Sequence, residues 1–238
     1  MKIISRIQRY KWCFRSLLSS LYFNFHYLPF SQARKLPILL YKPKFRNLKG
    51  SIEIQGGVKF GMIQLGKNSV SIYPNNGIMF DLRKGKIIFK GKCLIGNNSY
   101  ISTGDNSTLI FGYDFNSYTS LKLVCFDRIE FADKVLVGWD CIFMDTDLHK
   151  IKREDGTQSK GYGPIKIGSE TWIANGCVIL KNTRIPNKVI IAARSVLTGN
   201  IDVPEKTVIG TQHHVKVLAK DRWFDRSDPK IIYTHYNI

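Results

Sequence analysis

Closely paired cysteines are missing from this sequence of 238 residues, and it has only five histidines. Its five cysteines stand at positions 13, 93, 125, 141 and 177 and form no Cys-x-x-Cys pair, so neither a zinc ligand pair nor a disulfide framework is indicated. Cys141 and Cys177 fall on small inward positions of the repeat described below, and we interpret the cysteines as core residues. We therefore expect no metal cofactor and a reducing, cytoplasmic location.

A hydrophobic run long enough to span a bilayer is also missing from the N-terminal segment. MKIISRIQRYKWCFRSLLSSLYFNFHYLPF mixes aliphatic and aromatic residues with Arg and Lys, contains no glycine, and has no small-residue cleavage site of a secretory signal. We expect a helix to about Tyr22 within a leader of residues 1–48. In one hypothesis residues 1–24 lie on the inner face of the plasma membrane. In the other, the helix packs on the neighbouring domain or on a partner subunit.

Acidic residues are half as numerous as basic ones. The chain has 36 Lys and Arg against 18 Asp and Glu, which gives a formal net charge of +18. Such an excess attracts anions, including nucleic acids, anionic membranes, charged glycans and phosphorylated cofactors. No nucleic-acid-binding motif accompanies the charge, and we expect no nucleic-acid partner.

An aliphatic residue recurs at every sixth position of the C-terminal half. The series is Ile167, Ile173, Ile179, Ile185, Ile191 and Leu197, and the small or short residues that follow four positions later are Thr171, Cys177, Thr183, Val189 and Ser195. A period of six fits neither an amphipathic helix nor a single strand, but it fits a triangular coil in which each side uses six residues. We predict an all-β fold, a parallel β-helix of hexapeptide repeats over residues 49–212 with a basic tail over 213–238. An evenly spaced β-sandwich is the alternative.

The repeat is interrupted between Phe143 and Ile167. The segment DTDLHKIKREDGTQSKGYGP, residues 145–164, lacks the inward aliphatic pattern beyond its first positions, so we expect a loop that leaves the coil. The loop opens with Asp145, Asp147 and His149. A neutral imidazole can accept a proton from a hydroxyl, and a nearby carboxylate can fix its tautomer. A surface histidine without a catalytic role is the alternative.

Three stretches of this chain resemble a known family. MDTDLHKI, GPIKIGSETWIANGCVIL and VIIAARSVLTGNIDVPEKTVIGT are similar, in this order and spacing, to the hexapeptide-repeat acyltransferases, which include maltose and galactoside O-acetyltransferases and acetyltransferases of capsule and lipopolysaccharide gene clusters. The resemblance implies a left-handed β-helix, a homotrimer with sites between neighbouring subunits, acetyl-CoA as the donor, and a carbohydrate acceptor that is lipid- or nucleotide-linked.

The resemblance also implies roles for individual residues. His149 matches the general base, and Asp145 is expected to be its local partner. The residues expected to line the donor groove are Trp172, Ala174, Asn175, Ala192, Ala193, Thr198 and Lys216, and those expected to contact the acceptor are Asn116 and Asp147. The chain departs from the family pattern at Ala174, Arg194 and Gly199, which affects the donor groove more than the base.

We therefore expect an acetyl-CoA-dependent O-acetyltransferase that acts on a sugar hydroxyl in cell-surface polysaccharide biosynthesis. One alternative is an N-acetyltransferase of an amino-sugar nucleotide, which would use the same donor and base. Another is a β-helix that binds or supports a partner without catalysis. A relative of the γ-carbonic anhydrases would need three histidine ligands on adjacent coils, and the coil body contains only His149.

Overall fold

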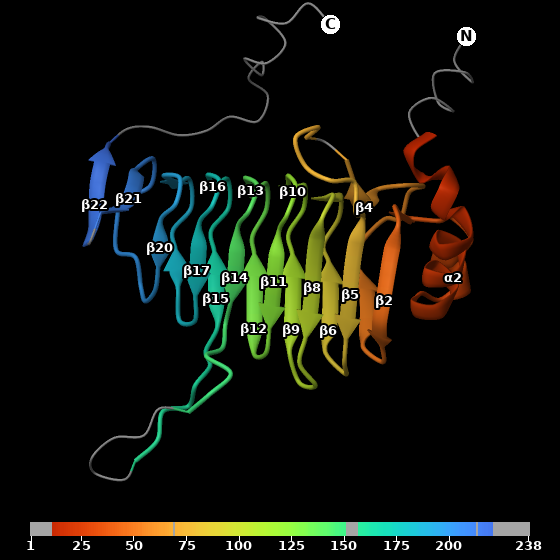
Figure 1. Ribbon diagram of the computed structural model, residues 1–238, viewed down its shortest axis with the longest axis horizontal. Helices are drawn as coiled ribbons and strands as arrows, with labels where there is room; N and C mark the ends of the chain where they lie inside the picture. The colour runs from red at the N-terminus through yellow and green to blue at the C-terminus, as the bar shows by residue number, and fades with distance from the viewer. Residues whose placement is uncertain (1–10, 69, 151–156, 213, 221–238) are drawn as a thin grey trace, which may run out of the picture.

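The chain winds into a three-sided coil (Figure 1) in a computed structural model that describes residues 11–68, 70–150, 157–212 and 214–220. Sheet 1 contains β1 (Ile38–Leu40), β4 (Ile63–Lys67), β7 (Cys93–Gly96), β10 (Phe115–Ser117), β13 (Leu136–Val137), β16 (Trp172–Ile173), β19 (Ile190–Ile191), β21 (Val208–Gln212) and β22 (His214–Ala219). Sheet 2 contains β2 (Pro43–Leu48), β5 (Ile78–Leu82), β8 (Ser99–Thr103), β11 (Lys122–Cys125), β14 (Ile142–Met144), β17 (Val178–Leu180) and β20 (Val196–Leu197). Sheet 3 contains β3 (Ser51–Ile54), β6 (Lys86–Phe89), β9 (Thr108–Phe111), β12 (Arg128–Phe131), β15 (Ile165–Ile167) and β18 (Arg184–Ile185).

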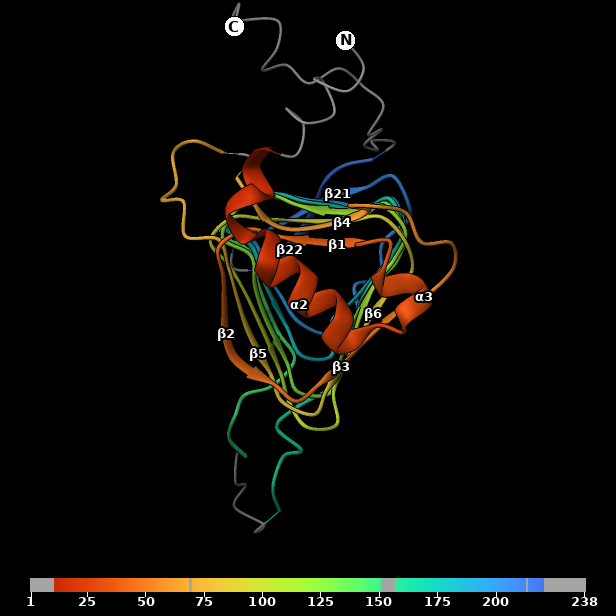
Figure 2. The same ribbon diagram turned by 90° about the vertical axis from the view of Figure 1, so that its right-hand side faces the viewer.

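The coil is left-handed. Seen from its N-terminal end in Figure 2, the chain passes from β1 at the top to β2 at the left and then to β3 at the lower right, while later strands lie farther from the viewer. A counterclockwise path that recedes from the viewer is a left-handed turn, in contrast to the usual right-handed crossover between parallel strands. The prediction of a left-handed parallel β-helix is confirmed.

The period of six sets the stacking between coils. Three sides of six residues bring the chain back to the same side after eighteen, so Ile167 pairs with Ile185, and Ile173 pairs with Ile191, in parallel register. Both the aliphatic residues and the small residues four positions later are buried in the repeats from Ile167 to Leu197. Side chains of both kinds therefore fill the inside of the prism, as the sequence pattern predicts.

The turns between the sides recur with the same spacing. A residue with a φ between 54° and 70° occupies one position of successive turns, namely Lys134, Asp140, Glu170, Gly176, Asn182, Lys188 and Arg194. This left-handed backbone conformation suits glycine and costs other residues energy. These turns allow three sides to close into a triangle, and the stacking of the buried side chains that follows outweighs the local energetic cost.

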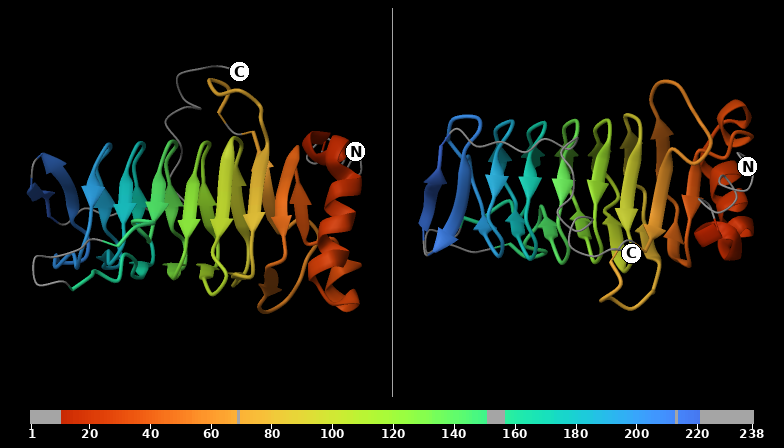
Figure 3. Two further views of the ribbon diagram at one scale, coloured as in Figure 1. Left: turned by 60° about the horizontal axis from the view of Figure 1, so that its bottom comes forward. Right: turned by 90° about the horizontal axis from the view of Figure 1, so that it is seen from above.

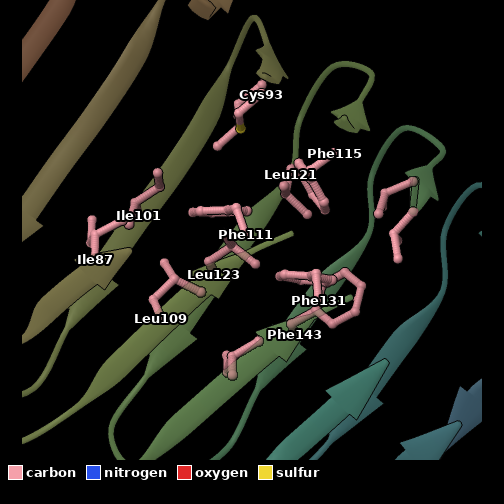
Figure 4. Packing of buried hydrophobic residues seen from close by; sticks show 14 of the residues in the cluster. Ile87, Cys93, Ile101, Leu109, Phe111, Phe115, Leu121, Leu123, Phe131 and Phe143 are labelled. Atoms are coloured by element: carbon pink, nitrogen blue, oxygen red, sulfur yellow. The ribbon is translucent and has the colours of Figure 1, made fainter. Parts of the chain in front are cut away.

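Aromatic rings form a column inside the middle coils (Figure 4). Phe111 lies between Phe89 and Phe131, with ring centroids 5.2 Å and 5.7 Å apart and the ring planes nearly parallel. All three side chains are at most 1% exposed. Burial of large rings in register is a major contribution to the stability of a coil whose individual strands are short.

A helical segment covers the N-terminal end of the coil. It consists of η1 (Lys11–Ser16), α2 (Leu17–Tyr27) and α3 (Phe30–Ala33). The buried Asn24 side chain accepts a hydrogen bond from the backbone N–H of Ile38 and donates one to the backbone carbonyl of Ile38. The Ser20 hydroxyl accepts a hydrogen bond from the backbone N–H of Leu40. These contacts satisfy the otherwise open edge of β1.

Two expectations for the ends of the coil need correction. The helix ends at Tyr27 and not near Tyr22, and the coil begins with β1 at Ile38, before the expected boundary at residue 49. Residues 1–10, within the proposed interfacial segment, lie outside the described part. At the other end β22 pairs antiparallel with β21, so residues 214–219 form a strand where we expected a tail. Figure 3 shows α2 and β22 at opposite ends of the coil. In the described ranges, no helix is long and apolar enough to cross a bilayer.

Candidate active site

A two-stranded ribbon projects from the corner between sheets 2 and 3. The chain leaves the coil after β14 and returns at β15, and the two arms of this loop extend away from the prism in Figure 1. The N–H of Asp147 donates to the carbonyl of Gly161 (2.7 Å), and the N–H of Gly163 donates to the carbonyl of Asp145 (3.0 Å). The base of the ribbon is therefore a hydrogen-bonded element that presents residues 147–150 at a defined place.

Asp145 anchors the ribbon to the coil. Its buried carboxylate accepts hydrogen bonds from the N–H of Phe126 (2.6 Å) and from the N–H of Asp127 (2.8 Å), both in the preceding coil. Burial raises the pKa of the Asp145 carboxyl above its ordinary value, and these backbone N–H groups oppose the rise. The expectation that Asp145 pairs with His149 is corrected, because both carboxylate oxygens are bonded to backbone N–H groups instead.

His149 is exposed on the arm of the ribbon that leaves the coil. Its backbone carbonyl lies against Gly161, whose φ is 76°, and a Cβ atom at that position would come within 2.6 Å of the carbonyl oxygen. The buried Thr146 hydroxyl accepts a hydrogen bond from the N–H of Leu148 and donates one to the carbonyl of Gly161. These contacts fix the backbone next to His149.

Two adjoining hollows flank the ribbon base. The smaller, of 170 Å³, is lined by His149 together with Lys150, Lys160 and Gly161, and the larger has a volume of 430 Å³. The residues that line both are Phe126, Thr146, Leu148 and Tyr162. The rings of Phe126 and Tyr162 lie 5.2 Å apart, and the Lys160 ammonium lies 4.2 Å from the Tyr162 ring centroid.

The larger hollow contains polar residues that sequence reasoning missed. These residues lie in three successive turns between sheets 2 and 3. They are Arg83 after β5, Asp105 and Asn106 after β8, and Asp127 after β11. Because the first and last of these turns are two coils apart along the chain, the residues do not form a short sequence motif. Only their stacking at one corner indicates a common site.

Asp147 and Thr198 belong to the same corner as the ribbon. The Lys181 ammonium lies 2.9 Å from the Asp147 carboxylate. The Thr198 hydroxyl donates a hydrogen bond to the carbonyl of Lys181. Thr198, expected in the donor groove, thus lies beside the ribbon and away from the other donor-groove candidates.

The remaining candidates lie across the prism. Trp172 and Asn116 point outward from sheet 1, since the residues on both sides of each are buried in the coil. They belong to β16 and β10, which are separated by one strand, β13. In Figure 2 sheet 1 forms the top of the triangle and the ribbon leaves from the bottom. One chain therefore does not bring Trp172 near His149.

Four small or short candidates lie at the corner between sheets 1 and 2. They are Ala174, Asn175, Ala192 and Ala193, in the turns after β16 and β19. The buried thiols of Cys141 and Cys177 donate to the carbonyls of Ala174 (3.1 Å) and Ala192 (3.2 Å), so core cysteines hold these turns. All five cysteines are free thiols.

The departures from the family pattern have visible consequences at the same corner. Arg194 is exposed with a φ of 60°, a conformation that favours glycine, and its side chain lies over Gly176. Gly199, by contrast, follows Thr198 at the corner between sheets 2 and 3 and has a positive φ of 80°. Lys216 is part of β22, and the structure describes its backbone only. Within the described ranges no group of three or more His, Cys, Asp or Glu residues is arranged to hold a metal ion.

Comparison with known proteins adds sequence and structural relatives. No protein-family model matches the chain. It is 26% identical over 145 residues to WbbJ of Escherichia coli K12, a protein assigned to lipopolysaccharide biosynthesis as an O-acetyltransferase, and the match covers 51% of this chain and 73% of WbbJ. Two crystal structures also align, the polysialic-acid-specific acetyltransferase NeuO (17% identity, TM-score 0.47, 82% of this chain and 88% of that one) and the polysialic acid O-acetyltransferase OatWY (18%, 0.35, 82% and 93%). The left-handed three-sided coil and the similarity to WbbJ confirm the resemblance of this chain to the hexapeptide-repeat acyltransferase family.

Proposed function

We propose that the chain is an acetyl-CoA-dependent O-acetyltransferase that modifies a sugar hydroxyl during the biosynthesis of a cell-surface polysaccharide. The observation that carries the proposal is His149, held at the base of a hydrogen-bonded ribbon beside two adjoining hollows. The name of WbbJ supports both the acetyl group and a glycan acceptor. We place the reaction in the cytoplasm, where acetyl-CoA is available.

His149 is the general base of the proposed reaction. A neutral imidazole nitrogen accepts the proton of the acceptor hydroxyl while the hydroxyl oxygen attacks the thioester carbonyl carbon. The C–S bond then breaks, the acetyl group remains on the sugar oxygen, and the proton passes from the imidazolium to the leaving CoA thiolate. Asp145 acts as a positioning residue, because its carboxylate holds the ribbon and not the imidazole.

The larger hollow is the proposed acceptor site. Its volume of 430 Å³ lies in the range of small-molecule pockets. Asp105 and Asn106 offer oxygen acceptors to sugar hydroxyls, and Arg83 offers charged donors to a carboxylate or phosphate of the acceptor. The rings of Phe126 and Tyr162 suit the apolar C–H face of a pyranose.

The donor lies, in this proposal, on the outer face of sheet 1. Trp172 is half-buried there, and Ala174 and Ala192 leave space at the neighbouring corner for a narrow pantetheine arm. The exposed Arg194 adds a cation on the same corner for the phosphates of CoA. Because this surface and the ribbon are on opposite sides of one prism, we propose a homotrimer in which the ribbon of one chain faces sheet 1 of the next.

Isothermal titration calorimetry, with acetyl-CoA added to the full chain, tests the identity of the donor. We expect saturable binding of acetyl-CoA and of CoA at one site per chain, and little binding of ATP. Absence of binding at millimolar acetyl-CoA would favour a non-catalytic β-helix.

An acceptor assay then separates O- from N-transfer. Released CoA is measured with hydroxyl-bearing oligosaccharides and with amino-sugar nucleotides, and the product is treated with hydroxylamine. We expect a hydroxylamine-labile ester on an oligosaccharide. A stable amide on the amino-sugar nucleotide would replace the proposal with the N-acetyltransferase alternative.

A further inference from the structure

We propose that the N-terminal cap of the coil docks on the surface of an anionic lipid bilayer. The docking surface, here called the end face, consists of the side chains of Phe14, Leu17, Leu18, Tyr22, Phe25 and Phe30. These large hydrophobic residues are all exposed, and Leu18 and Phe30 are 81% and 72% exposed. Exposed apolar residues on soluble surfaces are usually scattered singly, whereas a contiguous group indicates an interaction site.

Helical spacing gathers the end face on one side of α2. At about 100° per residue, positions 17, 18, 21, 22 and 25 fall within an arc of about 140°. The opposite side of the helix contains Ser20, Phe23 and Asn24, which are fully buried against the coil. Phe30 extends the apolar surface, since its ring lies 6.1 Å from that of Phe25.

The inner contacts make the end face a rigid platform. Asn24 and Ser20 bond to the backbone of β1, and the Phe23 ring lies 5.2 Å from that of Phe80 inside the coil. The helix therefore already has a complete set of partners on its inner side. The exposed side chains on its outer side are therefore available to a binding partner outside the described residues.

Charge identifies that partner as anionic. Residues 11–52, the described segment that builds this end of the coil, contain eight Lys and Arg and no Asp or Glu. Lys11, Arg15, Arg34 and Lys35 are exposed in η1 and directly after α3, the elements on either side of α2 in the chain. Aromatic and aliphatic side chains ringed by Lys and Arg are the pattern of a helix that lies in the plane of a membrane interface.

The orientation that follows matches the proposed reaction, and this step rests on the proposed function. In Figure 3, α2 lies across the end of the coil, so the end face looks along the coil axis and the coil would stand upright on the membrane. The ribbon leaves the coil next to β13 and β14. Four strand spacings separate β1 from β13 in sheet 1, which corresponds to about 19 Å. His149 would then stand at the height of the first sugars of a lipid-linked glycan.

Vesicle flotation with the full chain tests the docking. The probes are vesicles of phosphatidylcholine alone and vesicles of phosphatidylcholine and phosphatidylglycerol in equal parts. We expect the chain to float with the anionic vesicles, to bind neutral ones at least tenfold more weakly, and to dissociate as salt is added. The double variant Leu18→Ser/Phe25→Ser should bind anionic vesicles at least tenfold more weakly.

Controls keep the test independent of folding and of catalysis. Ile72→Ser removes a side chain that is 75% exposed on a loop outside the end face, and should bind vesicles as the parent chain does. The double variant must keep the thermal transition of the parent, since it changes no buried side chain. His149→Ala should also bind normally, so loss of transfer and loss of docking are distinguishable.

Three results would overturn the proposal. The first is unchanged flotation of the double variant. The second is equal binding to neutral and anionic vesicles. The third is a changed oligomeric state of the double variant, measured by light scattering, because that would make the end face a contact between copies of the chain.

Discussion

His149 and Trp172 lie on opposite sides of the same coil. His149 is carried by the ribbon at the corner between sheets 2 and 3, and Trp172 points outward from sheet 1. Asn116 shares the face of Trp172, while Asp147 and Thr198 share the corner of His149. The predicted site residues therefore form two half-sites, and a head-to-tail arrangement of identical chains would bring unlike halves together.

Mixing two inactive variants tests this arrangement. His149→Ala removes one half-site and Trp172→Ala impairs the other, so each variant alone should show little transfer. After the two are unfolded together and refolded in equal amounts, random assembly should restore about a quarter of the wild-type sites, because each intact site needs one half from each variant. Released CoA is the measurement. Recovery no greater than the sum of the separate variants would place the whole site within one chain.

Asp145→Ala should destabilise the protein by about 2–4 kcal/mol. The substitution leaves the buried N–H groups of Phe126 and Asp127 without an acceptor. Denaturant unfolding measures the loss. Asp147→Ala is the matched control, since its partly exposed pair with Lys181 should contribute only about 1 kcal/mol. Equal effects of the two substitutions would contradict the anchoring role of Asp145.

The same carboxyl predicts a pH dependence. Burial raises the pKa of Asp145 in the folded state, so the folded chain holds this proton more tightly than the unfolded chain. Its contribution to the free energy of unfolding is then greatest at low pH and falls as the pH rises from about 3.9, the ordinary Asp pKa, through the raised value. Over this pH range the free energy of unfolding of wild type, measured by urea unfolding, should fall relative to that of Asp145→Asn. A difference that moves in the opposite direction would mean that hydrogen bonding outweighs burial.

Much of the coil could be predicted from the sequence because the repeat is local. Any six consecutive residues from Ile167 onward carry the inward aliphatic and small positions, and the stacking of Ile167 on Ile185 follows from three equal sides. The position of the ribbon could be predicted for the same reason, since it is a gap in that pattern. The first coil was missed because β1 and β4 are joined by longer, irregular connections, which blur the period.

The contacts of the site could not be predicted because they cross between coils. Asp145 bonds to Phe126, a partner nineteen residues earlier that contributes only its backbone N–H, and no side-chain pattern reveals such a donor. The polar lining of the larger hollow likewise comes from several turns stacked at one corner. The candidates also lie on different sides of the prism, and a short motif does not specify which of the three sheets its strand joins.

Gly161→Ala should lower kcat by about 10- to 100-fold through misplacement of the base. The added Cβ atom would meet the His149 carbonyl at 2.6 Å, and the φ of 76° is unfavourable for alanine. Acetyl-CoA affinity should be unchanged, because the proposed donor contacts come from sheet 1 of the neighbouring chain, whose residues this substitution does not alter. Gly57→Ala is the control, since a Cβ atom there would meet nothing within 4 Å. Wild-type turnover by Gly161→Ala would show that the backbone next to His149 need not be held in place.

The central claim is that His149 is the base of an acetyl transfer from acetyl-CoA to a glycan hydroxyl. The most direct measurement is the rate of acetyl-ester formation on a hydroxyl-bearing oligosaccharide by wild type and by His149→Ala, with Lys44→Ala as control, since Lys44 is exposed in β2 and lines neither hollow. We predict a loss of about 10²- to 10⁴-fold for His149→Ala, with acetyl-CoA binding retained and Lys44→Ala close to wild type. Ester formation by His149→Ala at the wild-type rate would contradict the account.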